Sequence, residues 1–181
     1  GVPHFHIHLI PSMTDTKNAQ WNHTSYEKGE QAAYAEKIKS LVPSAEMIRF
    51  GKNGTDATSA AIRLARAYTG RDYVAVCGYH GWQDWYIGST SMHLGVPESV
   101  QKLSHPFVLN DIDAFEKLLT QFNGNIAAVI LEPISYFSPT QEFLNYLRER
   151  TLELGIILLF DETVTGFRVA PGGAQELLST T

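Results

Sequence analysis

Three short apolar runs constrain this chain more than any other feature, because each has the length of a strand and is apolar at nearly every position. They span residues 73–77 (YVAVC), 126–131 (IAAVIL) and 156–160 (IILLF). Such runs are typical of parallel sheets whose two faces are both covered by helices. Segments with helical patterning separate them, at residues 28–41, 56–68, 111–122 and 141–154. The alternation predicts an α/β fold with a parallel sheet.

The composition excludes several classes of protein. The 181 residues suffice for one domain with a buried core, and 44% hydrophobic with 18% charged residues argues against disorder. A net charge of -5 argues against nucleic acid as a partner. No run of 18 apolar residues predicts a membrane span, and the first residues lack the features of a secretory signal. Because Cys77 is the single cysteine, no internal disulfide can form, and we expect a cytoplasmic protein.

Two carboxylates follow apolar runs directly. Glu132 comes after residues 126–131, and Asp161 comes after residues 156–160. The carboxyl ends of parallel strands share one edge of the sheet, where open α/β sheets bind ligands. A carboxylate there can hold a cationic ring nitrogen or a metal, or it can cap a helix or form a loop salt bridge. Two strands that deliver carboxylates to one edge favour a site.

A glycine-rich turn precedes the second helical segment. Residues 51–55 (GKNGT) lead directly into it. Backbone N–H groups, the helix dipole and the hydroxyl of Thr55 together suit a phosphate group. The turn lacks the Gly-Lys-Ser/Thr of a P-loop, and a simple helix-capping turn would have the same composition. The segment therefore predicts either a phosphate site or a cap.

Four segments in register resemble the class III aminotransferases that depend on pyridoxal phosphate. They are Asn53-Gly54-Thr55-Asp56-Ala57, Gly78-Tyr79-His80-Gly81-Trp82, residues 127–133 (AAVILEP) and residues 160–168 (FDETVTGFR). The resemblance spans residues 28–175 and is strongest to the glutamate-1-semialdehyde aminomutase branch. It implies a partial large domain of a fold-type I enzyme, with pyridoxal 5'-phosphate as cofactor. The implied reaction is amino-group transfer or a 1,2-amino shift on a small amino acid or amino aldehyde.

The resemblance also implies roles for individual residues. Gly54 and Thr55 would bind the cofactor phosphate through backbone N–H and hydroxyl groups. Tyr79 would lie against one face of the pyridine ring, with His80 nearby. Asp161 would pair with the protonated ring nitrogen, which keeps the ring an electron acceptor. By the same resemblance we expect a homodimer and a small-molecule amino donor or acceptor as substrate.

Two further positions and one missing group complete the comparison with that family. Glu132 would orient groups around the ring, and Thr163 stands where the family usually has valine under the ring. The family's Schiff-base lysine lies some tens of residues beyond the Asp-Glu pair, whereas this chain stops at Thr181. We therefore expect the chain alone not to transaminate, and a non-catalytic remnant is an alternative. No lysine of the chain fits that place, since all lie upstream: Lys17, Lys28, Lys37, Lys39, Lys52, Lys102 and Lys117.

Three histidines near the start alternate with apolar residues. His4, His6 and His8 have the period of a strand and so share one face, which could bind zinc or copper. The pattern also resembles the signature of histidine-triad (HIT) nucleotide hydrolases and transferases, over residues 1–25. That resemblance implies His6 as the nucleophile toward an α-phosphate. A tag-like terminal strand is the remaining interpretation. We accordingly expect an N-terminal segment over residues 1–27 and the partial aminotransferase domain over residues 28–181.

Overall fold

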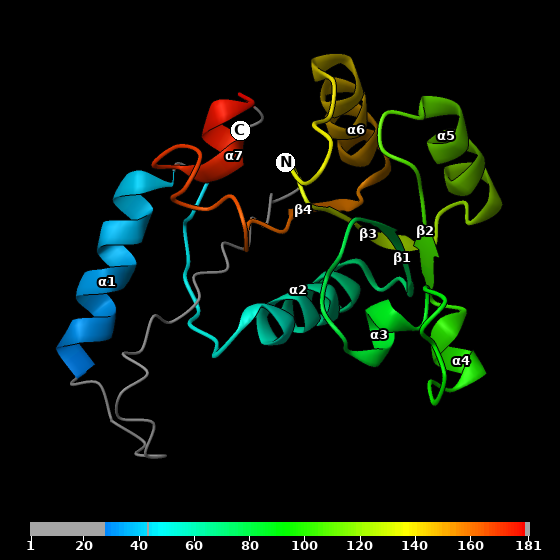
Figure 1. Cartoon of the computed structure of the whole chain (residues 1–181), viewed down its shortest axis with the longest axis horizontal. Helices are drawn as coiled ribbons and strands as arrows, with labels where there is room; N and C mark the ends of the chain where they lie inside the picture. Colours follow the sequence, from blue (N-terminus) through cyan, green and yellow to red (C-terminus); the bar gives the residue numbers. More distant parts are fainter. Residues whose placement is uncertain (1–27, 43, 180–181) are drawn as a thin grey trace.

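A four-stranded parallel sheet forms the centre of the molecule (Figure 1). The computed structural model describes residues 28–42 and 44–179. The strands are β1 (Tyr73–Cys77), β2 (Ser104–Pro106), β3 (Ile126–Leu131) and β4 (Ile157–Phe160), and they lie in the order β2-β1-β3-β4. All three pairings are parallel. The α/β fold with a parallel sheet, expected from the apolar runs, is confirmed.

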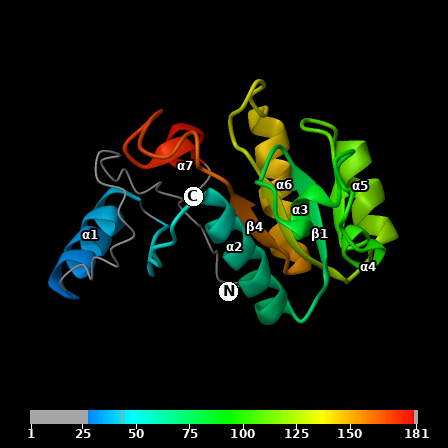
Figure 2. The ribbon, with the colours of Figure 1, turned by 60° about the horizontal axis from the view of Figure 1, so that its bottom comes forward.

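Helices cover both faces of this sheet (Figures 1 and 2). One face packs against α5 (Ile112–Gln121) and α6 (Gln141–Leu154), and the other against α2 (Gly54–Thr69) and α3 (Asp84–Ile87). Alternate residues of β3 point to opposite sides, so Val129 and Leu131 join the first core while Ala128 and Ile130 join the second. Every residue of β3 is buried, which explains its uninterrupted apolar sequence.

Most expected elements occur where the sequence placed them, with differences at their ends. The helix expected at 56–68 begins two residues earlier, since the Asn53 side chain caps it by accepting the N–H of Asp56 at 2.9 Å. Gly70 and Gly155 end α2 and α6 in the left-handed conformation. The segment between β1 and α5, for which the sequence predicts no helix or strand, contains α3, α4 (Glu98–Gln101) and β2. No described helix is long and apolar enough to cross a membrane.

The short helix α7 (Gly173–Leu177) is attached to the sheet through a buried carboxylate. Glu162, only 1% exposed, accepts hydrogen bonds from the hydroxyl of Thr165 at 2.6 Å, from N–H of Ala174 at 2.7 Å and from N–H of Gln175 at 3.1 Å. Gly173 adopts a positive φ, and a Cβ there would lie 2.4 Å from Glu162 Oε2. Both views place α7 beside the C-terminal end of α1 (Lys28–Leu41) (Figures 1 and 2).

We predict that Glu162→Gln lowers the free energy of unfolding by roughly 2 kcal/mol, because one amide oxygen cannot accept all three buried donors. Urea unfolding followed by circular dichroism measures the change. Glu149→Gln, at an exposed position on α6, is the matched control and should leave the midpoint unchanged. Equal midpoints for the two variants would contradict the role of Glu162.

An ion pair joins α5 to α6 on the outside of the sheet. Arg150 Nε donates to Glu116 Oε1 at 2.7 Å, and the hydroxyl of Tyr146 donates to the same oxygen. These hydrogen bonds, that from Arg150 foremost, hold the pKa of Glu116 below its usual value. Because the folded pKa lies below the unfolded one, Glu116 stabilises the fold above its unfolded pKa, and this contribution disappears as the pH falls through the folded pKa.

We predict that Glu116→Gln costs roughly 0.5–1 kcal/mol at pH 7, a value kept small because exposed ion pairs are screened by solvent. The difference from wild type should shrink toward zero as the pH is lowered below about 4. Thermal unfolding of wild type and Glu116→Gln, from pH 7 down to below about pH 4, tests this prediction. A difference that stays constant with pH would show that the ionised carboxylate is not responsible.

Candidate functional site

The carboxyl edge of the sheet brings the candidate residues of three strands together. β1 pairs with β3 and β3 with β4, in a register that aligns Cys77, Leu131 and Phe160. The pairing continues one residue further, because N–H of Glu132 donates to the Cys77 carbonyl at 3.1 Å and N–H of Asp161 donates to the Leu131 carbonyl at 2.9 Å. The strand ends therefore lie side by side, as their sequence positions predicted.

His80 and Asp161 form a buried pair across this edge. Nδ1 of His80 lies 2.9 Å from Oδ2 of Asp161, and the two residues are only 2% and 6% exposed. Nε2 of His80 faces the Cys77 carbonyl at 3.1 Å. Both ring nitrogens thus face acceptors, so the imidazole can satisfy both by donating from each nitrogen to a carboxylate and a carbonyl. The pair joins the loop after β1 to the end of β4.

Thr163 completes the surroundings of Asp161. Its N–H donates to Asp161 Oδ1 at 3.1 Å and its hydroxyl donates to the same oxygen at 2.6 Å. An ionised carboxylate offers about four lone-pair positions, and three donors occupy three of them. Hydrogen bonds to a carboxylate are charge-assisted and fix its orientation. One acceptor position of Asp161 therefore remains for a further donor.

The start of α2 lies against the same loop. Gly54 and Thr55 occupy the first two helical positions, whose N–H groups have no acceptor inside a helix. The hydroxyl of Thr58 donates to the His80 carbonyl at 3.1 Å. Gly81 adopts a positive φ, and a Cβ there would lie 2.5 Å from Thr55 Oγ1. The turn at residues 51–55 is thus both a cap and a set of N–H donors next to His80.

Thr58 and Gly81 were not expected to shape the site, although Gly81 stands in one of the resembling segments. Thr58 carries no signal in the sequence, because a threonine inside a helix most often bonds its own backbone. Gly81 does carry a signal in the sequence, since glycine is favoured where the backbone takes a positive φ or packs closely against another group. Together they bring the start of α2 against the loop after β1.

Glu132 supports the loop from the other side. Its Oε2 accepts the N–H of Tyr79 at 2.8 Å, and a Cβ on Gly78 would lie 2.7 Å from that oxygen. Burial first, and then the charge of Glu132, raise the pKa of the Cys77 thiol to about 11, so the thiol stays protonated and is a poor nucleophile at neutral pH. The ring of Tyr79 remains 57% exposed and makes an edge contact with Tyr86.

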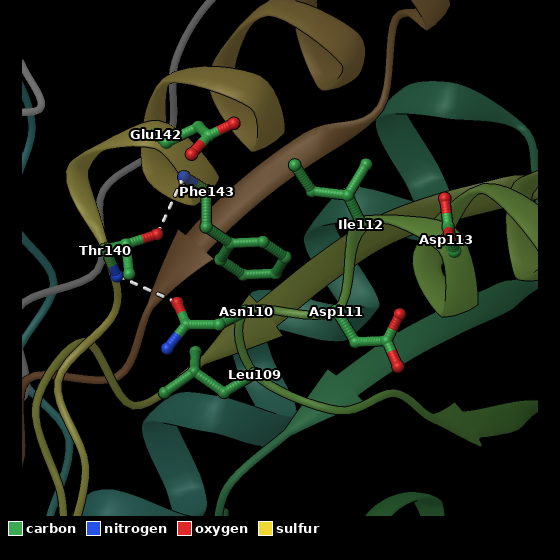
Figure 3. Close-up of a pocket in the computed structure, with 8 residues that line it drawn as sticks. All are labelled: Leu109, Asn110, Asp111, Ile112, Asp113, Thr140, Glu142 and Phe143. Atoms are coloured by element: carbon green, nitrogen blue, oxygen red, sulfur yellow. Dashed lines mark hydrogen bonds between the residues drawn. The ribbon is translucent and has the colours of Figure 1, made fainter.

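A pocket of about 460 Å³ lies on the side of the sheet that α5 and α6 cover, where these two helices begin (Figure 3). It is lined by residues 109–113 and by Thr140, Glu142 and Phe143. Its polar groups serve the two helix starts, since Asp111 Oδ1 accepts the N–H of Ala114 and Thr140 Oγ1 accepts the N–H of Phe143. None of the candidate site residues lines it.

The histidine triplet lies outside the described residues, so the interpretation of His6 as a HIT nucleophile stays a prediction. Among residues 28–42 and 44–179, no group of three or more histidine, cysteine, aspartate or glutamate side chains is arranged to hold a metal ion. Of the expected site residues, the structure joins seven through direct contacts or neighbouring positions: Gly54, Thr55, Tyr79, His80, Glu132, Asp161 and Thr163.

Comparison with known proteins identifies similar sequences. The family model "Aminotransferase class-III" matches residues 2–174, a range that includes the histidine triplet. A glutamate-1-semialdehyde 2,1-aminomutase from Pyrobaculum calidifontis is 44% identical over 163 residues, covering 82% of this chain and 37% of that protein. The same enzyme from Aquifex aeolicus is 40% identical, covering 81% of this chain and 38% of that protein.

Solved structures show the same relationship. An omega-transaminase from Sphaerobacter thermophilus superposes with a TM-score of 0.79 at 32% identity, covering 87% of this chain and 40% of that one. A lysine-to-alanine variant of a glutamate-1-semialdehyde aminomutase from Pseudomonas aeruginosa PAO1, in complex with PMP, gives 0.68 at 25% identity, covering 83% and 36%. This chain spans about two-fifths of the length of these relatives. The chain belongs to the class III aminotransferase family, within the pyridoxal-phosphate-dependent enzymes.

Proposed function

We propose that this chain forms the cofactor-binding part of a pyridoxal-phosphate-dependent enzyme that moves an amino group. One observation carries the proposal: a continuous series of contacts runs from Thr55 at the start of α2, through Gly81 and His80, to the Asp161 carboxylate. An anion site and a carboxylate with a remaining acceptor position are thereby held on one edge of the sheet. A small molecule with a phosphate and a protonated ring nitrogen needs both.

The start of α2 suits the phosphate end of such a molecule. The N–H groups of Gly54 and Thr55 and the positive end of a 16-residue helix attract an anion. The Thr55 hydroxyl lies beside Gly81, where any larger residue would collide with it. The glycine therefore keeps the space around this hydroxyl open for a phosphate oxygen.

Asp161 suits the nitrogen end. Three donors hold its carboxylate in place, and the fourth acceptor position can take a pyridinium N–H. The bound cofactor supplies an electron-accepting ring to the carbon that bears the amino group. The role of Asp161 is to keep a proton on the ring nitrogen, since a fixed carboxylate stabilises that positive charge.

Three further expected residues lie on the loop after β1, at the end of β3 and beside Asp161. Tyr79 offers an exposed aromatic ring on the same loop, where it can lie against a planar ligand. Glu132 fixes the backbone of that loop by accepting the Tyr79 N–H. Thr163 lies beside Asp161 on the solvent side, so that its side chain can contact the ring.

The relatives favour a 1,2-amino shift over transfer between two molecules. The curated relatives from Pyrobaculum calidifontis and Aquifex aeolicus, which are 44% and 40% identical to this chain, are both glutamate-1-semialdehyde 2,1-aminomutases. We therefore propose glutamate-1-semialdehyde as the substrate of the protein that carries this chain. A shift within one molecule needs no second substrate, whereas a transfer consumes an oxo acid. Turnover that strictly requires an added oxo acid would contradict the shift.

The expected cytoplasmic homodimer belongs to the same proposal. Sedimentation of the protein with and without cofactor measures its oligomeric state, and a monomer in both conditions would contradict a dimer.

Cofactor binding by this chain is tested directly with pyridoxamine 5'-phosphate (PMP). PMP is a suitable probe because a lysine-to-alanine variant of a related aminomutase is known in complex with it. We expect wild type to bind PMP, and Asp161→Asn to bind about tenfold more weakly, a loss of about 1.4 kcal/mol. The amide oxygen of asparagine can still accept from Thr163, and thermal unfolding of the variant checks that its fold is retained. Calorimetric titration measures both affinities.

Two controls accompany this titration. Asp113→Asn removes an exposed carboxylate on α5 and should leave PMP affinity unchanged. Inorganic phosphate should compete with PMP in both wild type and Asp161→Asn, because it binds at the start of α2. Absence of PMP binding by wild type, or equal affinity of wild type and Asp161→Asn, would overturn the proposed function.

A further inference from the structure

The carboxylate of Asp161 needs external contacts to fix its orientation. The terminal torsion of an aspartate joins an sp³ to an sp² carbon and has a broad, roughly two-fold preference, so the side chain itself does not set the rotation of the oxygens. In this structure Oδ2 is held by His80 and Oδ1 is held by Thr163. Which oxygen lone pair stays available to a ligand therefore depends on these two neighbours.

The two hydrogen bonds from Thr163 depend differently on which residue occupies this position. The backbone N–H, 3.1 Å from Oδ1, is available from any residue except proline at this position. The hydroxyl, at 2.6 Å, is available only from threonine or serine among the common small residues. It is the shorter of the two bonds. The side chain of Thr163 is exposed, whereas Asp161 is 6% exposed, so the hydroxyl reaches the carboxylate from the solvent side.

His80 is held more rigidly than Thr163. Its ring packs against both Trp85 and Tyr86, at centroid distances of 6.3 Å and 5.3 Å, and both of its nitrogens have partners. Oδ2 is thus fixed by a buried ring. Rotation of the carboxylate about that contact is opposed by the bonds to Oδ1, and the hydroxyl of Thr163 is the part of this restraint that a side chain supplies.

We infer that Thr163 is a positioning residue for the cofactor nitrogen: its hydroxyl sets the rotation of the Asp161 carboxylate so that one lone pair faces the ring N–H. This inference rests on the proposed function and assigns to the hydroxyl a role that a residue merely packed under the ring does not have. The phosphate end of the site, at Gly54 and Thr55, is independent of it.

The test is a cycle of variants with PMP affinity as its readout. Thr163→Val keeps the β-branched shape and removes only the hydroxyl. We expect it to weaken PMP binding about fivefold, in the range of one hydrogen bond to a charged group that is partly exposed. Thr163→Ser restores the hydroxyl and should bind within about twofold of wild type. Competition by inorganic phosphate should have the same constant in all three proteins, because the start of α2 is unaltered.

The Asp161→Asn background separates positioning from general packing. There the charge that the hydroxyl orients is gone, so adding Thr163→Val should change PMP affinity less than about twofold. An equal loss in both backgrounds would assign Thr163 to packing and overturn the inference, as would full affinity in Thr163→Val. Failure of wild type to bind PMP would instead overturn the proposed function and this inference with it.

Discussion

The hydrogen bond between His80 and Asp161 is the contact on which the arrangement of the sheet edge depends. It joins the loop after β1 to the end of β4, across the strand β3 that lies between them. Both groups are almost inaccessible to solvent, and burying either polar group without the other would be costly. The loop in turn places His80 O within reach of Thr58, so the start of α2 is held by the same contact.

Two adjacent carboxylates have separate tasks at the end of β4. Asp161 turns toward His80 and Thr163, whereas Glu162 turns toward Thr165 and the start of α7. Successive side chains of an extended segment point to opposite sides, so one acid can face a ligand while its neighbour secures the scaffold. The Asp-Glu pair thus couples the candidate site to the part of the chain that follows it.

Several elements were predictable because their own residues specify them. The run at 126–131 is apolar throughout and forms a strand buried on both faces, and the helix at 141–154 has its cap Thr140 and its terminating Gly155 in the sequence. The strand β2 was missed, since its residues Ser104–Pro106 have no strand pattern and become a strand only by pairing with β1. The helices α3 and α4 are single turns, too short for periodicity to reveal.

The candidate site, like the fold, could be predicted from the sequence only in part. The sequence by itself determined which strands end in Glu132 and Asp161 and that a glycine turn precedes a helix, because strand and helix signals are local. Only the tertiary structure decided that His80 pairs with Asp161 and that Gly81 packs closely against Thr55. These contacts join residues up to 81 positions apart, and their geometry follows from strand order and packing, which no local pattern encodes.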